Sequence, residues 1–280
     1  MKPPRFEYHA PSTLAEALGL LDEHGDEAKV LAGGQSLVPL MNFRLARPDR
    51  VVDLNGVAEL AGLREEDGGL LIGAMTRTAA LETSPSVAAR APLLRDAVRF
   101  VGHFQIRNRG TVGGSVAHAD PAAELPAAFL ALGATFTAAS KSGTRTIAAD
   151  DFFWGHFTTA LQADEILTEI RVPATAGRGY GFAELARRPG DFALGGVACV
   201  LGEAPRVVAF GLVARPVRLA SAETQAAGGA TADGVRRAVT EEVQGLDATS
   251  DLHAGGDYRK LLAAELAGRA YAQARERAAA

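Results

Sequence analysis

The chain has a single cysteine, Cys199, among its 280 residues. One thiol cannot form an internal disulfide, ligate an iron–sulfur cluster or complete a cysteine-based zinc site. Cys199 lies in the apolar run GGVACVLG, where a small buried strand residue is the simplest interpretation. A free buried thiol fits a reducing compartment, so we expect a cytoplasmic protein.

The sequence also lacks a long apolar run and an excess of basic residues. No stretch reaches the length of a membrane-spanning helix, and the first residues, MKPPRFEYHAPST, lack the apolar segment of a secretory signal. The net charge is −4, whereas nucleic-acid binding needs a concentrated basic surface. Because 48% of the residues are hydrophobic, the chain can build the cores of two or three subdomains.

Helix and strand signals are mixed along the chain and predict an α+β fold. The pattern predicts strands over residues 28–32, 50–54, 70–74, 134–139, 165–172, 181–186, 193–201 and 206–212. Helices are predicted over residues 13–24, 36–46, 78–88, 93–101, 121–132, 231–243 and 258–278. The glycine-rich segment TAGRGYG, residues 175–181, is the best boundary between two regions.

Two glycine segments stand apart from this pattern. AGGQS, residues 32–36, lies between a predicted strand and a predicted helix, and TVGGS, residues 111–115, precedes another helix. Glycine lets backbone N–H groups approach a phosphate oxygen, and an adjacent helix start favours an anion. Neither segment matches GxGxxG or GxxxxGK[ST], so the residues alone predict either simple turns or an anion or nucleotide site of unspecified kind.

A serine-hydrolase reading of the second segment is weaker. Gly113–Ala117 approximates the G-x-S-x-G nucleophile elbow, but QIRNRG precedes it instead of an apolar strand, and Ala117 replaces the last glycine. Asp151 or Asp191 with His253 would have to complete a triad, and nothing fixes their geometry. The pair His118 and Asp120 lacks a third ligand at sensible spacing, so no metal site is predicted.

Longer strings resemble a known family. "FEYHAPSTLAEALGLL", "LMNFRLARPDRVVDLN", "QIRNRGTVGGSVAHADPAAELPA", "DEILTEIRVP", "FAELARRPGDFALGGVA" and "GDYRKLLAAELAGRA" together cover nearly the whole chain. They are similar to the FAD-binding, or medium, subunits of the molybdenum hydroxylases, the xanthine dehydrogenase family that includes the medium subunits of carbon monoxide dehydrogenase. One departure is Phe104, which stands where a polar residue is expected.

The resemblance implies a fold and a division of labour. It implies a two-subdomain FAD-binding domain of the PCMH type over residues 1–174, with subdomains of about 1–55 and 56–174. A smaller domain with an antiparallel sheet and helices would follow over residues 175–280. A large subunit would carry the molybdenum cofactor, and a small subunit would carry two [2Fe–2S] clusters and pass electrons to the FAD of this chain. The reduced flavin would serve an external acceptor, in a dimer of heterotrimers.

The resemblance also implies site residues, none of them catalytic. The two loops that would hold the FAD diphosphate contain Ala32, Gly33, Gly34, Gln35, Ser36, Thr111, Gly113, Gly114 and Ser115. The resemblance also implies cofactor contacts by Lys29, Asp120, Glu124 and Leu167, and an approach of Asp191 and Phe192 to the flavin edge. Simpler readings compete with most of these contacts: an exposed lysine for Lys29, a helix N-cap for Asp120, a first-turn carboxylate for Glu124, and core residues for Leu167 and Phe192.

Two other functions stay open from the sequence. The chain could be a self-sufficient FAD-dependent oxidoreductase, or a nucleotide-binding module without redox function. The hydroxylated substrate would bind to another chain, so carbon monoxide, purines, aldehydes and N-heterocycles are equally compatible with this sequence.

Overall fold

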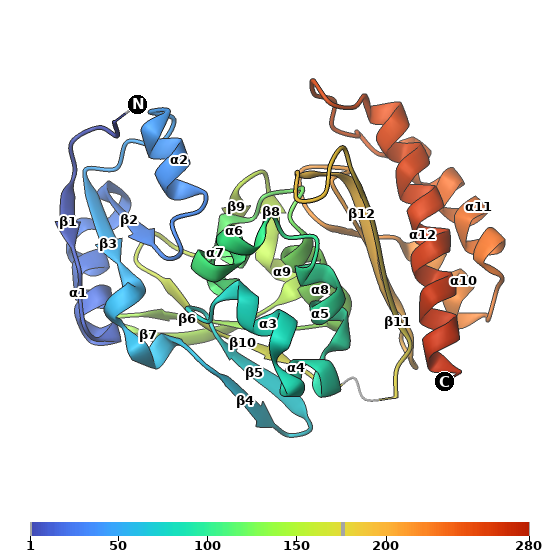
Figure 1. Ribbon diagram of the computed structural model, residues 1–280, viewed down its shortest axis with the longest axis horizontal. Coiled ribbons are helices and arrows are strands. Elements are labelled where there is room, and N and C mark those ends of the chain that lie inside the picture. Colours follow the sequence, from blue (N-terminus) through green and yellow to red (C-terminus); the bar gives the residue numbers. More distant parts are fainter. Residues whose placement is uncertain (1, 175–176, 280) are drawn as a thin grey trace.

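The computed structural model describes residues 2–174 and 177–279. Figure 1 shows three parts in sequence order: a small N-terminal sheet, a central sheet with helices, and a C-terminal sheet covered by long helices. The first two residues of the predicted boundary segment, Thr175 and Ala176, lie outside the described residues. The division into domains at this point therefore stays a prediction.

The N-terminal part is a parallel sheet with strand order β1-β3-β2. Its elements are β1 (Glu7–His9), α1 (Leu14–His24), η1 (Gly25–Glu27), β2 (Ala28–Leu31), α2 (Leu37–Asn42), β3 (Arg50–Asp53), η2 (Leu54–Gly56) and η3 (Ala58–Leu60). Thr13 and Glu16 form a capping box that starts α1, and Ala17 and Leu21 bury its apolar face. The helix predicted over residues 13–24 and both predicted strands of this part are confirmed.

The central part is an antiparallel sheet with strand order β4-β5-β10-β6-β7. Its strands are β4 (Leu63–Glu66), β5 (Gly69–Gly73), β6 (Thr135–Ser140), β7 (Gly143–Ala148) and β10 (Ile166–Val172), with the small pair β8 (Phe153–Gly155) and β9 (Thr158–Thr159). Its helices are α3 (Thr78–Thr83), α4 (Pro85–Arg90), α5 (Pro92–Val98), α6 (Phe104–Arg109), α7 (Val112–His118), α8 (Glu124–Leu132) and α9 (Ala149–Phe152). Every residue of α8 is buried, so this helix is the centre of the main core.

Several predicted helices have different limits. The helix predicted over 78–88 is two helices, because Pro85 starts α4 and Ser84 caps it by accepting from the amide of Val87. The helix predicted over 121–132 begins only at Glu124, and the one predicted over 36–46 ends at Asn42. The second glycine segment is not a loop, since α7 begins at Val112.

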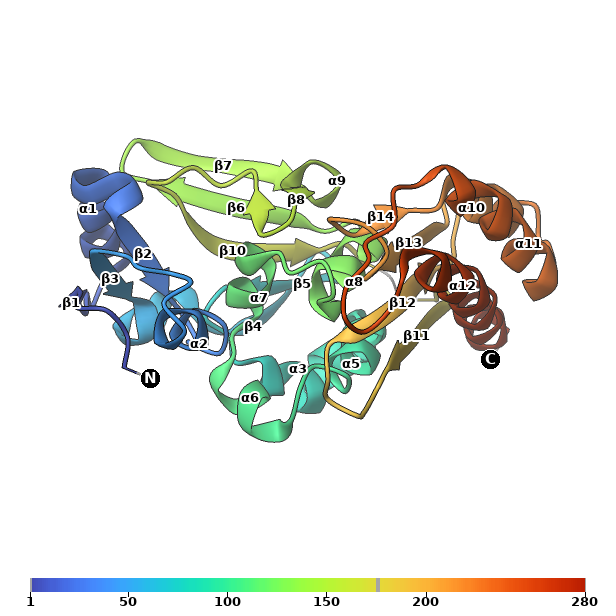
Figure 2. The same cartoon turned by 90° about the horizontal axis from the view of Figure 1, so that it is seen from above.

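The C-terminal part is an antiparallel meander, β11-β12-β13-β14, covered by helices. Its elements are β11 (Tyr180–Ala186), β12 (Ala193–Val200), β13 (Arg206–Phe210), β14 (Val217–Arg218), α10 (Ala220–Ala227), α11 (Ala232–Glu242), η4 (Val243–Gly245) and α12 (Gly256–Ala278). One face of the sheet packs on α12, and the opposite face packs on α8 (Figures 1 and 2). Cys199 faces α12 and is fully buried, as its apolar context predicts. None of the helices within 2–174 and 177–279 is long and apolar enough to cross a membrane.

Candidate cofactor site

The first glycine segment carries a row of free backbone donors. None of the amide N–H groups of residues 33–37 donates a hydrogen bond within the part of the chain that the structure describes. Gly34 has a φ of +73°, a conformation that suits glycine, and the side-chain amide of Gln35 donates to the carbonyl of Gly33 at 3.0 Å. Helix α2 begins directly afterwards at Leu37. Free N–H groups at a helix start are the usual cradle for a phosphate.

The second glycine segment has fewer such donors: four of its five amides donate to protein oxygens, and that of Thr111 has no hydrogen bond among the described residues. Val112 and Gly113 donate their amides to the carbonyls of Thr76 and Ala74, at 2.9 and 2.8 Å. Gly114 donates to the Thr111 hydroxyl at 3.1 Å, and Ser115 donates to the Thr111 carbonyl, also at 3.1 Å. Four amides of the second segment thus already bind protein oxygens, and the diphosphate contacts predicted for Thr111, Gly113, Gly114 and Ser115 stay predictions.

The glycines of the second segment serve close packing. A Cβ on Gly113 would lie 2.4 Å from Cβ of Ala74, and one on Gly114 would lie 2.6 Å from Oγ1 of Thr111. Neither glycine has a positive φ, so backbone conformation is not the reason for glycine here. The side chain of Ala32 also lies 3.3 Å from the position of a Cβ on Gly114, which places the first segment against the second.

Two residues that the sequence analysis missed join these segments. Arg77 donates to the carbonyl of Arg109 at 2.6 Å and to Oδ1 of Asn55 at 2.7 Å. Asn55 in turn donates to the carbonyl of Ala32 at 2.9 Å. The only sequence signal was a polar residue shortly after the predicted strand RVVDL, a usual place for side chains that support a site.

Asp120 lies in the segment that joins α7 to α8, and Glu124 is the first residue of α8. Glu124 is only 7% exposed, and burial, helped by the nearby Asp120 charge, raises its pKa to about 7. Asp120 accepts from the amide of Ala122 at 2.9 Å. The residue at the N-cap of α8 is Ala123, so the alternative reading of Asp120 as the cap of this helix is wrong. The burial of Glu124 argues against a solvated carboxylate in the first turn of the helix and favours a carboxyl that binds cofactor hydroxyls.

A second carboxyl with a buried oxygen, that of the half-buried Glu184 on β11, was also missed. Its Oε2 atom is buried and has no hydrogen-bond partner among the described residues. Burial, followed by the charge of Glu124, raises the pKa of Glu184 to about 9. The sequence signal was an acidic residue inside the apolar strand YGFAELA.

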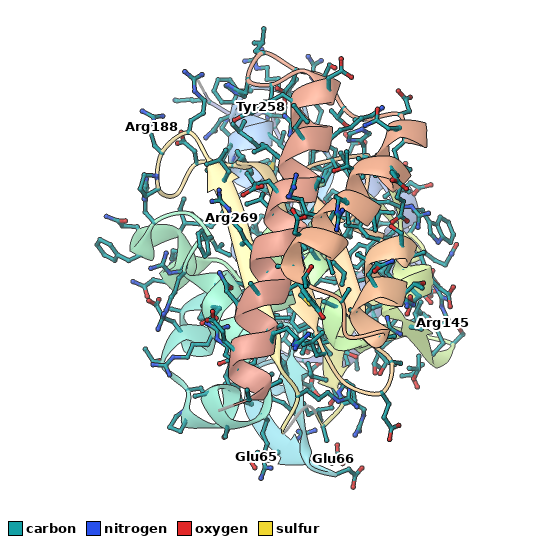
Figure 3. All side chains as sticks on the ribbon, turned by 90° about the vertical axis from the view of Figure 1, so that its right-hand side faces the viewer. Glu65, Glu66, Arg145, Arg188, Tyr258 and Arg269 are labelled. Carbon is teal, nitrogen blue, oxygen red and sulfur yellow. The ribbon has the colours of Figure 1, made fainter. Side chains whose placement is uncertain are left out.

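The turn between β11 and β12 carries the last two predicted contacts. Phe192 is 75% exposed, so the alternative reading as a core residue is wrong, and its ring can cover a ligand. Asp191 pairs with Arg188 of the same turn at 2.9 Å; Figure 3 labels Arg188 there. The turn rests on the start of α6, because a Cβ on Gly190 would lie 2.6 Å from the ring of His103.

The remaining candidates occupy ordinary positions. Leu167 is 5% exposed and belongs to the main core, and Lys29 is exposed, with no hydrogen bond or ion pair of its side chain among the described residues. His118 packs its ring 4.9 Å from that of Phe157, and burial lowers its pKa. No group of three or more potential metal ligands is found within residues 2–174 and 177–279. The roles predicted for Leu167 and Lys29 stay predictions.

An open surface pocket lies elsewhere, lined among others by Arg145, Asp150, Trp154 and Arg215. None of the predicted site residues lines it. The arginines of this pocket are already engaged, Arg145 with Glu165 at 2.6 Å and Arg215 with the carbonyl of Phe153 at 3.3 Å, whereas the first glycine segment offers a row of free amides. The glycine segments therefore remain the better site.

The free amides of the first segment, the buried carboxyls and the exposed Phe192 fit a dinucleotide that carries a flat ring. Residues 4–175 match the protein family described as "FAD binding domain in molybdopterin dehydrogenase". The chain belongs to this family, and its relatives are oxidoreductase subunits.

Individual relatives match over nearly their full length. The carbon monoxide dehydrogenase medium chain of Hydrogenophaga pseudoflava is 40% identical over 278 residues, covering 96% of this chain and 97% of that one. Subunit alpha of the 6-hydroxypseudooxynicotine dehydrogenase complex of Paenarthrobacter nicotinovorans is 40% identical over 287 residues, covering 99% and 97%. A solved structure of the Hydrogenophaga carbon monoxide dehydrogenase superposes with a TM-score of 0.94, covering 99% of each chain.

Proposed function

We propose that this chain is the FAD subunit of a molybdenum hydroxylase complex. It receives electrons from [2Fe–2S] clusters on a small partner subunit and passes them to an external acceptor. A large partner subunit would bind the molybdenum cofactor and oxidise the substrate. The observation that carries the proposal is the row of free amides at residues 33–37, held against α7 in a chain of this family.

The residues of this chain bind and orient the cofactor. The amides of residues 33–37 would donate to diphosphate oxygens, and Glu124 would meet hydroxyls of the ribityl or ribose group. Phe192 would cover the ring from the β11–β12 turn, with Asp191 beside it. FAD supplies the electron storage, so no side chain of this protein has to act as a catalytic acid or base.

The names of the relatives and the single cysteine of this chain both support the presence of partner subunits. Relatives are called subunits or medium chains, and Cys199 alone cannot ligate a [2Fe–2S] cluster. Exposed apolar side chains on the loop after α2 and on α6 offer a surface for docking: Phe43, Leu45 and Phe104. A dimer of heterotrimers in the cytoplasm is the assembly we propose.

The substrate of the complex cannot be assigned from this chain. Relatives named for carbon monoxide and for 6-hydroxypseudooxynicotine are both 40% identical to it. Such unlike substrates with equally similar medium chains support a substrate site on another subunit. The self-sufficient oxidoreductase is the competing function.

The first prediction is that the purified chain holds FAD, one per chain, and no FMN. A row of amides suits a diphosphate, whereas FMN has a single phosphate. Heat release followed by chromatography against both standards measures this. FMN alone would contradict the proposed site, and a protein without flavin absorbance would favour the non-redox module.

The same preparation separates the proposed subunit from a self-sufficient enzyme. The isolated FAD-loaded chain should be inert toward carbon monoxide, xanthine and aldehydes. After reduction with dithionite it should still be reoxidised by an artificial acceptor. Substrate oxidation at the rate of a flavin oxidase would overturn the subunit proposal.

A further inference from the structure

Glu184 sits on the face of β11 that packs against the FAD-binding part. Alternate residues of a strand share a face, so Glu184 lies on the same side as Phe182. Phe182 packs against Phe100 of the central part with ring centroids 5.4 Å apart, and it belongs to the main core. The carboxyl of Glu184 therefore faces the junction between the two parts, and its Oε2 atom has no partner among the described residues.

Glu124 lies opposite, as the first residue of α8. This helix packs on β12 and β13, and β12 is the direct neighbour of β11. The segment before α8 is tied to the end of β13, because Gly211 donates its amide to the carbonyl of Pro121 at 2.7 Å. Across the sheet, Phe210 pairs with Gly196 and Gly196 pairs with Glu184, so the start of α8 and Glu184 lie at the same end of the sheet, where the charge of Glu124 acts on Glu184. The Glu124 carboxyl accepts from its own amide and forms no ion pair in residues 2–174 and 177–279.

The ionisable surroundings of this pair are acidic. Asp120 acts on Glu124, and His118 in turn responds to Asp120. The buried cation on the far side of the sheet, Arg259, is bound to the carbonyls of Leu194 and Gly211 and to Asp251. No lysine or arginine pairs with either glutamate in the described chain.

Two neighbouring carboxyls at a buried junction, with no cation paired to either among the described residues, cannot both be ionised at modest cost. The ionised form of one raises the proton affinity of the other, so the protons belong to the pair as a unit. Burial, together with the charge of Glu124 acting on Glu184, favours a protonated carboxyl in the pair, and a nearby added negative charge draws in a further proton.

We propose that Glu124 and Glu184 form a proton-sharing carboxyl pair between the FAD-binding and C-terminal parts, and that it takes up a proton when the FAD beside it is reduced. The proposal rests on the proposed function, because Glu124 must lie beside bound FAD. Two electrons from the reductant and one proton from water give the reduced ring one negative charge. A second proton from water converts the remaining carboxylate of the pair to the acid, and oxidation of the flavin releases both protons. Glu184 is thereby a positioning and charge-compensating residue for the cofactor.

The midpoint potential of the bound flavin tests the proton uptake. Wild type, Glu184→Gln and the exposed surface control Glu241→Gln are titrated with dithionite between pH 7 and pH 9. Each extra proton per two electrons steepens the dependence by about 30 mV per pH unit. We expect Glu184→Gln to be shallower than wild type by up to this amount and the control to match wild type. Equal slopes in all three proteins would overturn the inference while leaving FAD binding intact.

A measurement on wild type alone avoids any folding defect of the variant. Infrared difference spectra of the reduction in H2O and D2O should show a growing C=O band of a protonated carboxylic acid, shifted by deuterium. No change in this region on reduction would contradict the proposal.

The apoprotein tests the pair without flavin. Unfolded glutamates ionise near pH 4.5, whereas burial raises the folded pKa of Glu184 to about 9. The folded state therefore binds more protons in this window, and its stability falls as pH rises from about 4.5 through 9. The decline in Tm between pH 5 and pH 9 should be smaller in Glu184→Gln than in wild type and Glu241→Gln. An equal decline of Tm in all three proteins would contradict the proposed carboxyl pair. Failure of the wild-type protein to bind FAD would instead contradict the proposed function.

Discussion

At Gly33 the requirement for glycine comes from a contact between two distant segments. A Cβ there would lie 2.4 Å from the carbonyl oxygen of Arg109 and 2.6 Å from Cα of Gly110. Backbone atoms cannot swing aside as a flexible side chain can, so even alanine forces the two segments apart. Because Gly33 also begins the row of free amides, such a shift changes the geometry of the proposed phosphate cradle.

We therefore predict that Gly33→Ala weakens FAD binding by at least tenfold, or about 1.4 kcal/mol. The apoprotein should lose about 1–3 kcal/mol of unfolding free energy from the overpacked contact. Fluorescence titration of the apoprotein with FAD and denaturant unfolding measure the two effects.

The matched control is Gly19→Ala in α1, where a Cβ would meet nothing within 4 Å. Alanine is the better helix former, so this variant should bind FAD normally and gain up to about 1 kcal/mol of stability. If Gly33→Ala binds FAD as tightly as Gly19→Ala does, the first glycine segment is not the phosphate site.

At the scale of elements, side-chain hydrogen bonds connect the segment before α7 to the segment after β2. Arg77 and Asn55 form a chain of hydrogen bonds from the carbonyl of Arg109, just before α7, to the carbonyl of Ala32, just after β2. Bonds from a charged guanidinium are stronger than those between neutral groups. This chain fixes the distance between the two glycine segments.

Arg77→Met should remove that link while keeping much of the apolar stem of the side chain. We expect FAD affinity to fall by about tenfold, because a hydrogen bond to a charged group contributes about 1.5–3 kcal/mol. The overall fold should persist, as far-UV circular dichroism would show.

Arg64→Met is the control, since Arg64 is exposed and its ion pair with Glu169, at 3.3 Å, is on the surface. Its FAD affinity should equal that of wild type. An equal loss in both variants would mean that arginine removal acts through general charge and not through the connection between the segments.

The elements that sequence reasoning found are those with an apolar pattern or a local signal. The capping residues Thr13 and Glu16 indicate the start of α1, and β12 is recognisable as an apolar run. By contrast, β4 and β7 are largely exposed edge strands rich in charged and hydroxyl residues, without apolar alternation, and were missed. Helix α7 has two glycines, poor helix formers, in its first turn and depends on tertiary hydrogen bonds to Ala74 and Thr76.

The site residues likewise divide into those with a local sequence signal and those that only the folded chain brings together. The motif AGGQS located the free amides, because phosphate binding uses contiguous backbone. Asn55, Arg77 and Glu184 come from three separate elements and meet the glycine segments or Glu124 only in the folded chain. No local pattern marks such residues, and only the resemblance pointed to Asp191 and Phe192.

On the scale of the whole molecule, the C-terminal sheet is buried on both faces. Phe182 and Phe210 contribute to the main core with ring centroids 5.6 Å apart, while Val197 and Cys199 pack under α12. Removing the C-terminal part would therefore expose the main core and also remove Glu184 from the junction. We therefore predict that the two parts, residues 2–174 and 177–279, unfold as one cooperative unit.

The outer surface of this unit carries apolar side chains that the fold does not need. Phe104 on α6 is 63% exposed, and Phe43 and Leu45 after α2 are also exposed. Trp154 on β8 is similarly exposed, at 61%, and Figure 2 shows β8 and α6 on opposite sides of the molecule. Aromatic side chains at an interface supply much of the binding energy when they become buried.

We predict that Phe104→Ser, combined with Phe43→Ser, keeps FAD but loses the partner subunits, whereas Trp154→Ser keeps both. Each substituted side chain is exposed in the isolated chain, so its removal costs little folding free energy, while the assembled complex loses about 2 kcal/mol or more for each buried anchor. Co-expression with the large and small subunits, affinity capture of this chain and flavin quantification measure both properties. A complex that survives the double substitution but dissociates with Trp154→Ser would place the docking surface on the side of β8.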